Sequence, residues 1–402
     1  MAAVLLTGCA PGVREAQPFD GIWASDGFAV YLDVHGGNAD IYEHSPAHCA
    51  LVYGGSARGI SDVLSLDQGR LVLDDSGRVI HFDPIAALPG GCADDFASDD
   101  AARITAVASA TMEELYRPAL DPAWTGRLEG VMPGLAGIID PAATFAALVS
   151  LLAPLDDPGV RLAVDDSSIW DGVWSAGGGP FAGREPYVPP GLETSAVTGD
   201  DGIVTGSFGA AGYFGLARLG AFAGDDEGSQ RVLAAELDAV LAESASVIVD
   251  LRASSSGRAV EGMLVASRFV PDERLVATQM SGATAAGDVT VSPMVGGPFA
   301  GRVVVLVGPG TAGAAEMLVL ALRDLPGVTV VGEATAGSPT PPLARTLPNG
   351  WLLGVPTLDL VTPDGASWSG VPIAPGVMAP VTESDLDSGI DPGVAAALAL
   401  LS

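Results

Sequence analysis

Hydroxyl and carboxyl side chains gather around one strand-to-helix turn, where they could support nucleophilic catalysis. Residues 303–307 (VVVLV) form a short β-branched run, and apolar residues at helical spacing follow over 312–323. Thr311 lies between the two runs, and Glu316 lies early in the predicted helix. In a parallel sheet such a turn directs side chains into the crevice beyond the strand's carboxyl end, beside backbone N–H groups that can hold an oxyanion. The pattern predicts a site at this turn.

A second strand continues the unit but brings no general base. The apolar run 328–331 ends at Gly332, and Ser338 follows as a second hydroxyl near the same crevice. A hydroxyl attacks a carbonyl only when a nearby base accepts its proton. All 18 basic residues are Arg, which is too basic for this role, and all four His lie within the first 81 residues. Neither Thr311 nor Ser338 therefore has an identifiable base.

The same segment resembles the core of the tail-specific, or C-terminal-processing, serine peptidases. Members of that family typically read T/S-A-S-x-x-E after the first strand and G-E-x-T-x-G after the next. This chain reads TAGAAE over 311–316 and GEATAG over 332–337. Further matches occur in order at residues 212–216 (GYFGL), at 247–252 (VIVDLR), and at the closing segments 360–365 and 370–377.

The resemblance implies a catalytically degenerate member of the family. The family's nucleophile position falls on Gly313, which has no side chain. The His of the tricorn-type branch falls on Gly159, within a stretch reading LDDPGV. The bacterial branch instead has a Lys just after the second strand, where this chain has Ser338 and Pro339. No catalytic base is expected at either place.

The remaining polar groups near this site have other expected roles. By analogy with the family, the N–H groups near Gly257 and Ala314 would remain as oxyanion donors, able to bind a carboxylate or peptide carbonyl without cleaving it. Glu316 is expected to cap or orient its neighbours. Asp156 and Asp157 precede a Pro-Gly turn and are expected to be solvated, and no second acidic cluster supports a metal or glycosidase site. No metal and no cofactor are predicted.

Composition restricts the class of partner. The chain has 402 residues, 48% of them hydrophobic, which is enough for two or three globular domains. Its 49 acidic residues give a formal net charge of −31. Such a charge repels nucleic acids and anionic membrane surfaces. The expected partners are a peptide or protein ligand, or a small apolar ligand.

The three cysteines point to an exported protein. Residues 6–9 (LTGC) resemble a bacterial lipobox, which implies a lipid anchor at Cys9 as the only membrane attachment; a frayed apolar end with a chance cysteine is the alternative. In an exported chain, Cys49 and Cys92 are then expected to form a disulfide. Two buried thiols, or a zinc site that also uses nearby His residues, are the alternatives. The expected location is the outer face of a bacterial membrane, or the medium if the chain is secreted.

Four regions are expected along the chain. Short β runs separated by turns over residues 19–93 predict a small antiparallel domain, and alternating strands and helices after residue 194 predict an α/β core. The resemblance implies that this core is a ClpP/crotonase-like βαβ sheet. The four regions are a signal remnant and tether (1–18), the β domain (19–93), a helical segment with a Gly/Pro-rich linker (94–193) and the peptidase-like core (194–402). Within these regions the predicted helices are 101–116, 141–152, 229–243 and 260–269.

These observations favour a lipoprotein pseudopeptidase that binds its ligand in the former active-site cleft. One alternative is an active serine-type peptidase with a non-standard nucleophile or base. Another is a structural surface lipoprotein that acts through its β domain.

Overall fold

The computed structural model describes most of the chain in two compact units. The first unit comprises Met1–Asp75 and Val79–Phe96, and the second comprises Ser76–Arg78 and Ala97–Ser402. The described residues are 19–45, 48–56, 64–75, 78–92, 96–117, 120–165, 168–170, 179–181, 186–198, 202–216, 226–255 and 259–402.

The first unit is a small antiparallel sheet with the strand order β4-β3-β2-β1-β7-β6-β5. Its apolar residues alternate along the strands: in β2, Leu32 and Val34 are buried, whereas the adjacent Tyr31 and Asp33 are less so. A disulfide joins Cys49 to Cys92 within this unit. The strands are β1 (Gly21–Ser25), β2 (Val30–His35), β3 (Asn38–Ser45), β4 (His48–Ser56), β5 (Leu64–Asp67), β6 (Arg70–Asp75) and β7 (Arg78–Ile85).

The second unit is built on a mixed sheet with the order β10-β11-β12-β13-β16-β17-β21. The strands from β12 to β21 pair in parallel, and β10 and β11 form an antiparallel extension at one edge. The central strands are continuous apolar runs because both faces of a parallel sheet are covered. The bounds are β10 (Glu193–Thr198), β11 (Ile203–Phe208), β12 (Ala211–Leu216), β13 (Ser246–Asp250), β16 (Arg302–Val307), β17 (Val328–Gly332) and β21 (Val377–Met378).

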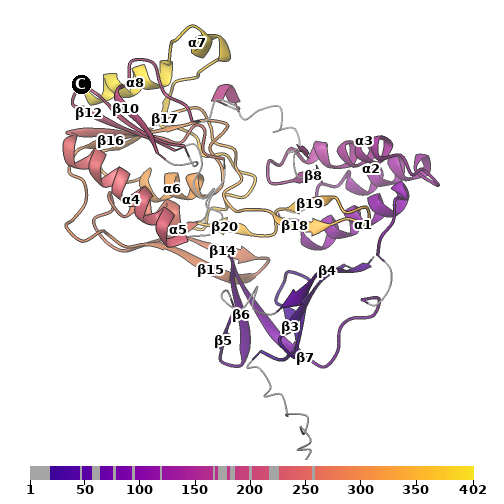
Figure 1. Cartoon of the computed structure of the whole chain (residues 1–402). Coiled ribbons are helices and arrows are strands. Elements are labelled where there is room, and N and C mark those ends of the chain that lie inside the picture. Colours follow the sequence, from indigo (N-terminus) through magenta and orange to yellow (C-terminus); the bar gives the residue numbers. More distant parts are fainter. Residues whose placement is uncertain are drawn as a thin grey trace, which may run out of the picture. The chain divides into compact units, whose positions relative to one another are not determined.

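Helices cover both faces of this sheet (Figure 1). In β13, Val247 and Val249 belong to a core shared with α4, α5 and α6, whereas Ile248 belongs to a core shared with α8. This arrangement confirms the expected fold class, which combines a mixed α/β core and a small antiparallel β unit. The helices are α4 (Asp226–Glu243), α5 (Ala259–Ala266), α6 (Ala314–Leu322), α7 (Glu383–Asp387) and α8 (Pro392–Leu401).

A helical segment precedes the core, as expected. Its helices are α1 (Ala101–Leu115), α2 (Trp124–Val131) and α3 (Pro141–Leu152). Asp100 and Asp140 begin α1 and α3, because each carboxylate accepts a hydrogen bond from a backbone N–H of the first turn. No helix in the described part of the chain combines the length and the apolar character needed to cross a bilayer.

Two smaller sheets were not predicted as such. One has the order β15-β14-β20, and the other, β18-β19-β8-β9, joins two strands that precede the predicted core to two strands within it. Strand β19 pairs with β8, whose residues lie in the predicted helical and linker region. Their bounds are β8 (Arg161–Asp165), β9 (Ser168–Trp170), β14 (Arg274–Ser281), β15 (Thr284–Val291), β18 (Leu343–Thr346), β19 (Leu352–Val355) and β20 (Asp359–Val361).

Candidate active site

The turn between β16 and α6 has a sharp backbone bend without a reactive side chain. Gly313 is the N-cap of α6 and has φ 62° and ψ −131°, a conformation that residues with a Cβ rarely adopt. A sharp strand-to-helix turn carries the nucleophile in α/β-hydrolases. Here the N–H of Gly313 donates to the carbonyl of Ser338 at 2.9 Å. The turn geometry is present, and the nucleophile is absent.

Thr311 does not replace that nucleophile. Its side chain is fully buried, and its hydroxyl donates to the carbonyl oxygen of Leu251 at 2.9 Å while accepting from the N–H of Gly308 at 3.0 Å. Both functions of the hydroxyl are therefore used by backbone groups. Through these hydrogen bonds, Thr311 links Leu251, the residue that follows β13, to the turn.

Gly159, which the resemblance aligns with the family's His, is closely surrounded by other side chains. A Cβ built on Gly159 would lie 2.6 Å from Cγ of Pro356, closer than side-chain carbons approach. It would also lie 3.1 Å from Oγ of Ser338 and 3.1 Å from Oδ1 of Asp157. The structure thus brings Gly159 beside Ser338, whose carbonyl oxygen accepts a hydrogen bond from the N–H of Gly313. Gly159, Ser338 and Gly313 therefore lie close together, and a side chain at Gly159 would require Pro356 to shift.

The expectation of a solvated acidic turn is wrong for Asp157. Its carboxylate is buried and accepts hydrogen bonds from the hydroxyl of Tyr116 at 2.9 Å and from the N–H of Gly159 at 2.8 Å. Burial raises its pKa above the ordinary value. Because 41 residues separate Tyr116 from Asp157, no local spacing in the sequence indicates this contact.

Glu316 fixes the loop that follows β17. Its fully buried carboxylate accepts hydrogen bonds from the hydroxyl of Thr335 and from the N–H groups of Gly337 and Ser338, the last two at 2.7 Å. Burial raises the pKa of Glu316 to about 7. These contacts hold Ser338 against the start of α6. Glu316 therefore positions the group formed by Gly313, Ser338 and Gly159, which we call the remnant site.

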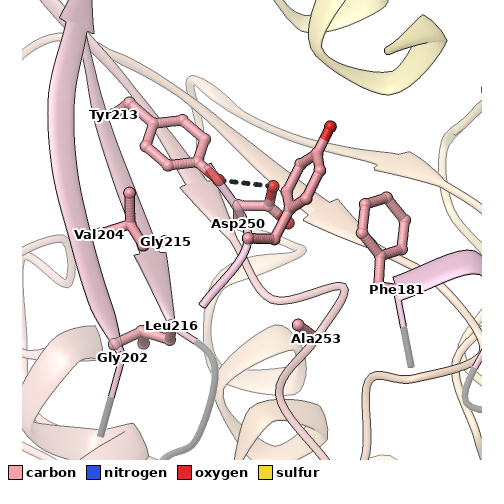
Figure 2. A pocket seen from close by; sticks show the side chains of 9 residues that line it. Phe181, Gly202, Val204, Tyr213, Gly215, Leu216, Asp250 and Ala253 are labelled. Carbon is pink, nitrogen blue, oxygen red and sulfur yellow. Dashed lines mark hydrogen bonds between the residues drawn. The ribbon is translucent and has the colours of Figure 1, made fainter. Parts of the chain in front are cut away.

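The end of β13 is fixed by a buried ionic cluster. Arg252 hydrogen-bonds to the carboxylates of Asp250 and Asp391, and its guanidinium lies 4.3 Å from the centre of the Phe181 ring. Burial alone would lower the pKa of Arg252, but the two carboxylates raise it well above its ordinary value. Tyr213 donates to Asp250 at 2.8 Å (Figure 2). The loop after Arg252 reaches the turn, since the N–H of Ala312 donates to the carbonyl of Ser254 at 3.0 Å.

The cavity beside this cluster is small. It is lined by Phe181, Tyr213 and Asp250 among others, and its volume of about 10 Å³ is enough for about one water molecule. It is lined from β11, β12 and the end of β13, and the rings of Phe181 and Tyr213 lie at its border (Figure 2). This cavity does not offer space for a peptide.

The other predicted site residues are placed as follows. Ala314 is fully buried, with its carbonyl oxygen 2.8 Å from the position of a Cβ on Gly262. Gly257 and Cys9 lie outside the described residues. Both sulfurs of Cys49 and Cys92 are in the disulfide, which leaves no thiolate for zinc. Among the described residues, no three His, Cys, Asp or Glu side chains gather as a metal site.

Part of the chain matches a known family model. Residues 213–378 match the model of peptidase family S41. The chain is similar in structure to a candidate peptidase from Parabacteroides merdae, with a TM-score of 0.57, 20% identity, and coverage of 75% of this chain and 96% of that one. At this identity the likeness shows the fold alone. No curated protein matches the chain.

Weaker likenesses join that match. One is to a lipoprotein from Streptococcus agalactiae, with a TM-score of 0.44, 14% identity, and coverage of 79% of this chain and 98% of that one. Another is to the tricorn protease, with a TM-score of 0.45, 15% identity, and coverage of 93% and 45%. The α/β core of this chain is thus similar to the tail-specific-protease-like family S41 over residues 213–378, in agreement with the resemblance of its motifs.

Proposed function

We propose that this chain is a pseudopeptidase, an S41-type protein that binds a peptide or protein segment at its former active site without hydrolysing it. The observation that carries the proposal is the paired loss at Gly313 and Gly159, together with the atoms of Pro356 that occupy the place of the missing base. Hydrolysis needs both a nucleophile and a base.

An exposed apolar side chain beside the remnant site supports ligand binding there. The N–H of Gly370 donates to the carbonyl of Gly337 at 2.8 Å, and the next residue, Val371, is 44% exposed. Exposed apolar side chains beside backbone polar groups suit an extended peptide better than a charged small molecule. A small apolar ligand is the second candidate for the same place.

A serine-type peptidase with Ser338 as nucleophile is the alternative that one observation favours. The hydroxyl of Ser338 and the carboxylate of Asp157 both border the space that a Gly159 side chain would fill. A carboxylate of raised pKa can act as a general base. Against this role, Asp157 already accepts two hydrogen bonds, and the backbone N–H of Ser338 is held by Glu316.

Activity-based labelling tests the proposal. The purified protein is incubated with a fluorophosphonate probe and with a broad peptide library, and labelling and cleavage are measured. We expect neither. Hydrolysis that disappears in Ser338→Ala and in Asp157→Asn would replace the pseudopeptidase with the active alternative.

Binding is measured separately by fluorescence polarisation with the same peptides. We expect Val371→Asp to weaken the binding of apolar peptides, whereas the matched change Val295→Asp, at a 97% exposed residue outside the site, leaves it unchanged. Equal losses of peptide affinity in the two variants would show that the peptides do not bind at the remnant site.

We also propose export and lipid anchoring through Cys9, on the lipobox-like residues 6–9. In a bacterial host, labelled palmitate should enter the full chain and not the Cys9→Ala variant. Equal labelling of both chains would contradict the anchor and would leave the pseudopeptidase proposal untouched. The structural alternative predicts that the first unit alone retains partner binding.

A further inference from the structure

Glu316 connects three segments of the second unit through one network of hydrogen bonds. From the first turn of α6, its fully buried carboxylate accepts from the hydroxyl of Thr335 and from the N–H groups of Gly337 and Ser338. The Thr335 hydroxyl in turn accepts from the N–H of Ile373 at 2.8 Å. One buried carboxylate thus links α6 to the loop after β17 and, through that loop, to Ile373.

The same network holds both ends of the segment 370–373. At one end, the N–H of Gly370 donates to the carbonyl of Gly337 at 2.8 Å. At the other end, Ile373 and Thr335 share two hydrogen bonds, because the N–H of Thr335 also donates to the carbonyl of Ile373 at 3.1 Å. Gly337 and Thr335 are both partners of the buried carboxylate. The position of the segment therefore depends on that group.

The contacts of Glu316 fit its ionised form. All three partners of its carboxylate in the described part of the chain are donors, and an ionised carboxylate only accepts. A protonated carboxyl has an O–H that needs an acceptor of its own. The Thr335 hydroxyl has a single proton and gives it to Glu316. Protonation therefore either reverses the hydrogen bond with Thr335 or leaves a buried N–H without its partner, and both changes disturb the network.

Burial and hydrogen bonding act on Glu316 in opposite directions. Burial raises its pKa to about 7, although the three hydrogen bonds favour the ionised form. Helix α5 and strand β14 pack against α6. The titratable side chains on the elements around the carboxyl are Glu261 of α5, Arg274 of β14, Glu333 after β17 and Asp157 before β8. None of them is among the causes of this pKa shift, so the charge of Glu316 changes near neutral pH without an ion partner.

We propose that Glu316 is a proton-operated clamp that regulates ligand binding at the remnant site. In its ionised form the carboxylate holds the segment 370–373, and with it the exposed side chain of Val371, beside the site. In its protonated form it releases the segment, and the ligand loses this contact. The regulation of binding rests on the proposed peptide-binding function, whereas the release of the segment does not.

Amide hydrogen exchange on the full chain tests the clamp without a ligand. Exchange is measured at one pH well below 7 and at one well above it, and each rate is corrected for the intrinsic rate at that pH. Relative to the amides of β16, we expect the protection of the Gly337, Ser338 and Ile373 amides to be about fivefold or more lower at the acidic pH. Equal relative protection at the two pH values would overturn the proposal.

Fluorescence polarisation with the apolar peptides tests the regulation. We expect the wild type to bind about fivefold or more tightly above pH 7 than below it, with a midpoint near 7. Glu316→Gln has a neutral side chain at every pH, so its affinity should be low and constant across this range. Glu333→Gln, a matched change in the same loop, should keep the pH dependence of the wild type.

The outcomes separate the clamp from the function on which its regulation rests. A complete absence of peptide binding contradicts the proposed function, and hydrogen exchange then decides the clamp alone. A wild-type affinity that is independent of pH, or a pH dependence that survives in Glu316→Gln, would overturn the regulation. A pH dependence that is lost in Asp157→Asn would overturn it by assigning the proton to Asp157. If Glu316→Gln does not fold, the exchange data and the pH profiles of the wild type, Glu333→Gln and Asp157→Asn still decide.

Discussion

Asp391 accepts hydrogen bonds from both terminal nitrogens of Arg252, at 2.8 Å each, although 139 residues separate the two in sequence. Asp391 also caps α8 by accepting from the N–H of Val394. The pair therefore ties the C-terminal helix to the end of β13. Burial opposes the ionised form of Asp391, but Arg252 more than compensates and lowers its pKa.

Removing Arg252 should strongly destabilise the second unit. Arg252→Met leaves two buried carboxylates without their cation, which costs about 3–5 kcal/mol of unfolding free energy. Urea denaturation measures this loss. The control is Arg127→Met, which breaks the more exposed pair with Asp121 and should destabilise the protein much less. Equal losses of unfolding free energy in the two variants would show that the buried cluster stabilises the protein no more than the exposed pair does.

Glu316 should give the protein a pH-dependent stability. Its folded pKa of about 7 exceeds the ordinary value of 4.5, so the folded state holds this proton more tightly than the unfolded state. The stabilisation is complete below pH 4.5 and is lost as the pH rises through 7, by up to about 3 kcal/mol.

The Glu316→Gln variant isolates that contribution. The difference in unfolding free energy between the wild type and this variant should fall as the pH rises from 4.5 to above 7. Urea titrations at several pH values measure it. Asp324→Asn, at an exposed carboxylate, is the control and should show a constant difference. A constant difference for Glu316→Gln as well would contradict the raised pKa.

The conformation of Gly313 should make any side chain at this position costly. Gly313→Ala places a Cβ at φ 62° and should destabilise the protein by about 1–3 kcal/mol. Gly376→Ala is the matched control, because its Cβ would meet only the carbonyl oxygen of Val330, at an ordinary 3.6 Å. Chemical denaturation compares the two. A smaller cost at Gly313 than at Gly376 would count against the strained turn.

Gly159 should tolerate a side chain only when Pro356 is also changed. Gly159→Ala brings Cβ into Cγ of Pro356, which costs about 1–3 kcal/mol. Pro356→Ala removes that atom, so the double variant should recover part of the loss. A double-mutant cycle measures the coupling between the two residues. Strict additivity would show that Pro356 does not occupy the place of the base.

Reducing the disulfide should destabilise the first unit alone. Cys49 and Cys92 close a loop with a sequence separation of 43, for which chain-entropy arguments give about 2–4 kcal/mol. Denaturation with and without reductant, monitored by Trp23 of this unit, measures the loss. The Cys49→Ala/Cys92→Ala variant should behave like the reduced protein and lose its sensitivity to reductant. A wild type that is indifferent to reductant would contradict the expected stabilisation.

Local patterns predicted the parts of the fold whose periodicity is strong. The expected helix 141–152 coincides with α3, and the strand 303–307 lies within β16, because Asp140 caps the helix and the strand is apolar throughout. The sheet in which β19 joins the β18–β19 pair to the β8–β9 pair was not predicted. Its partners are distant in sequence, and no short-range spacing encodes their register.

The sequence predicted which positions form the candidate site, but not which side chains surround them. The motifs located Gly313, Gly159 and Ser338, and the structure brings these three together. The buried state of Asp157 and the intrusion of Pro356 depend on contacts between distant segments. A single sequence carries no signal for such contacts.

The glycine at position 313 also has a consequence for the history of the chain. A serine in the same turn would adopt an unfavourable backbone conformation at a cost in stability, whereas glycine adopts it without that cost. Restoring the nucleophile and the base would each lower stability, while neither change alone would restore hydrolysis. For the proposed pseudopeptidase, each single reversion is therefore expected to lower stability without restoring hydrolysis.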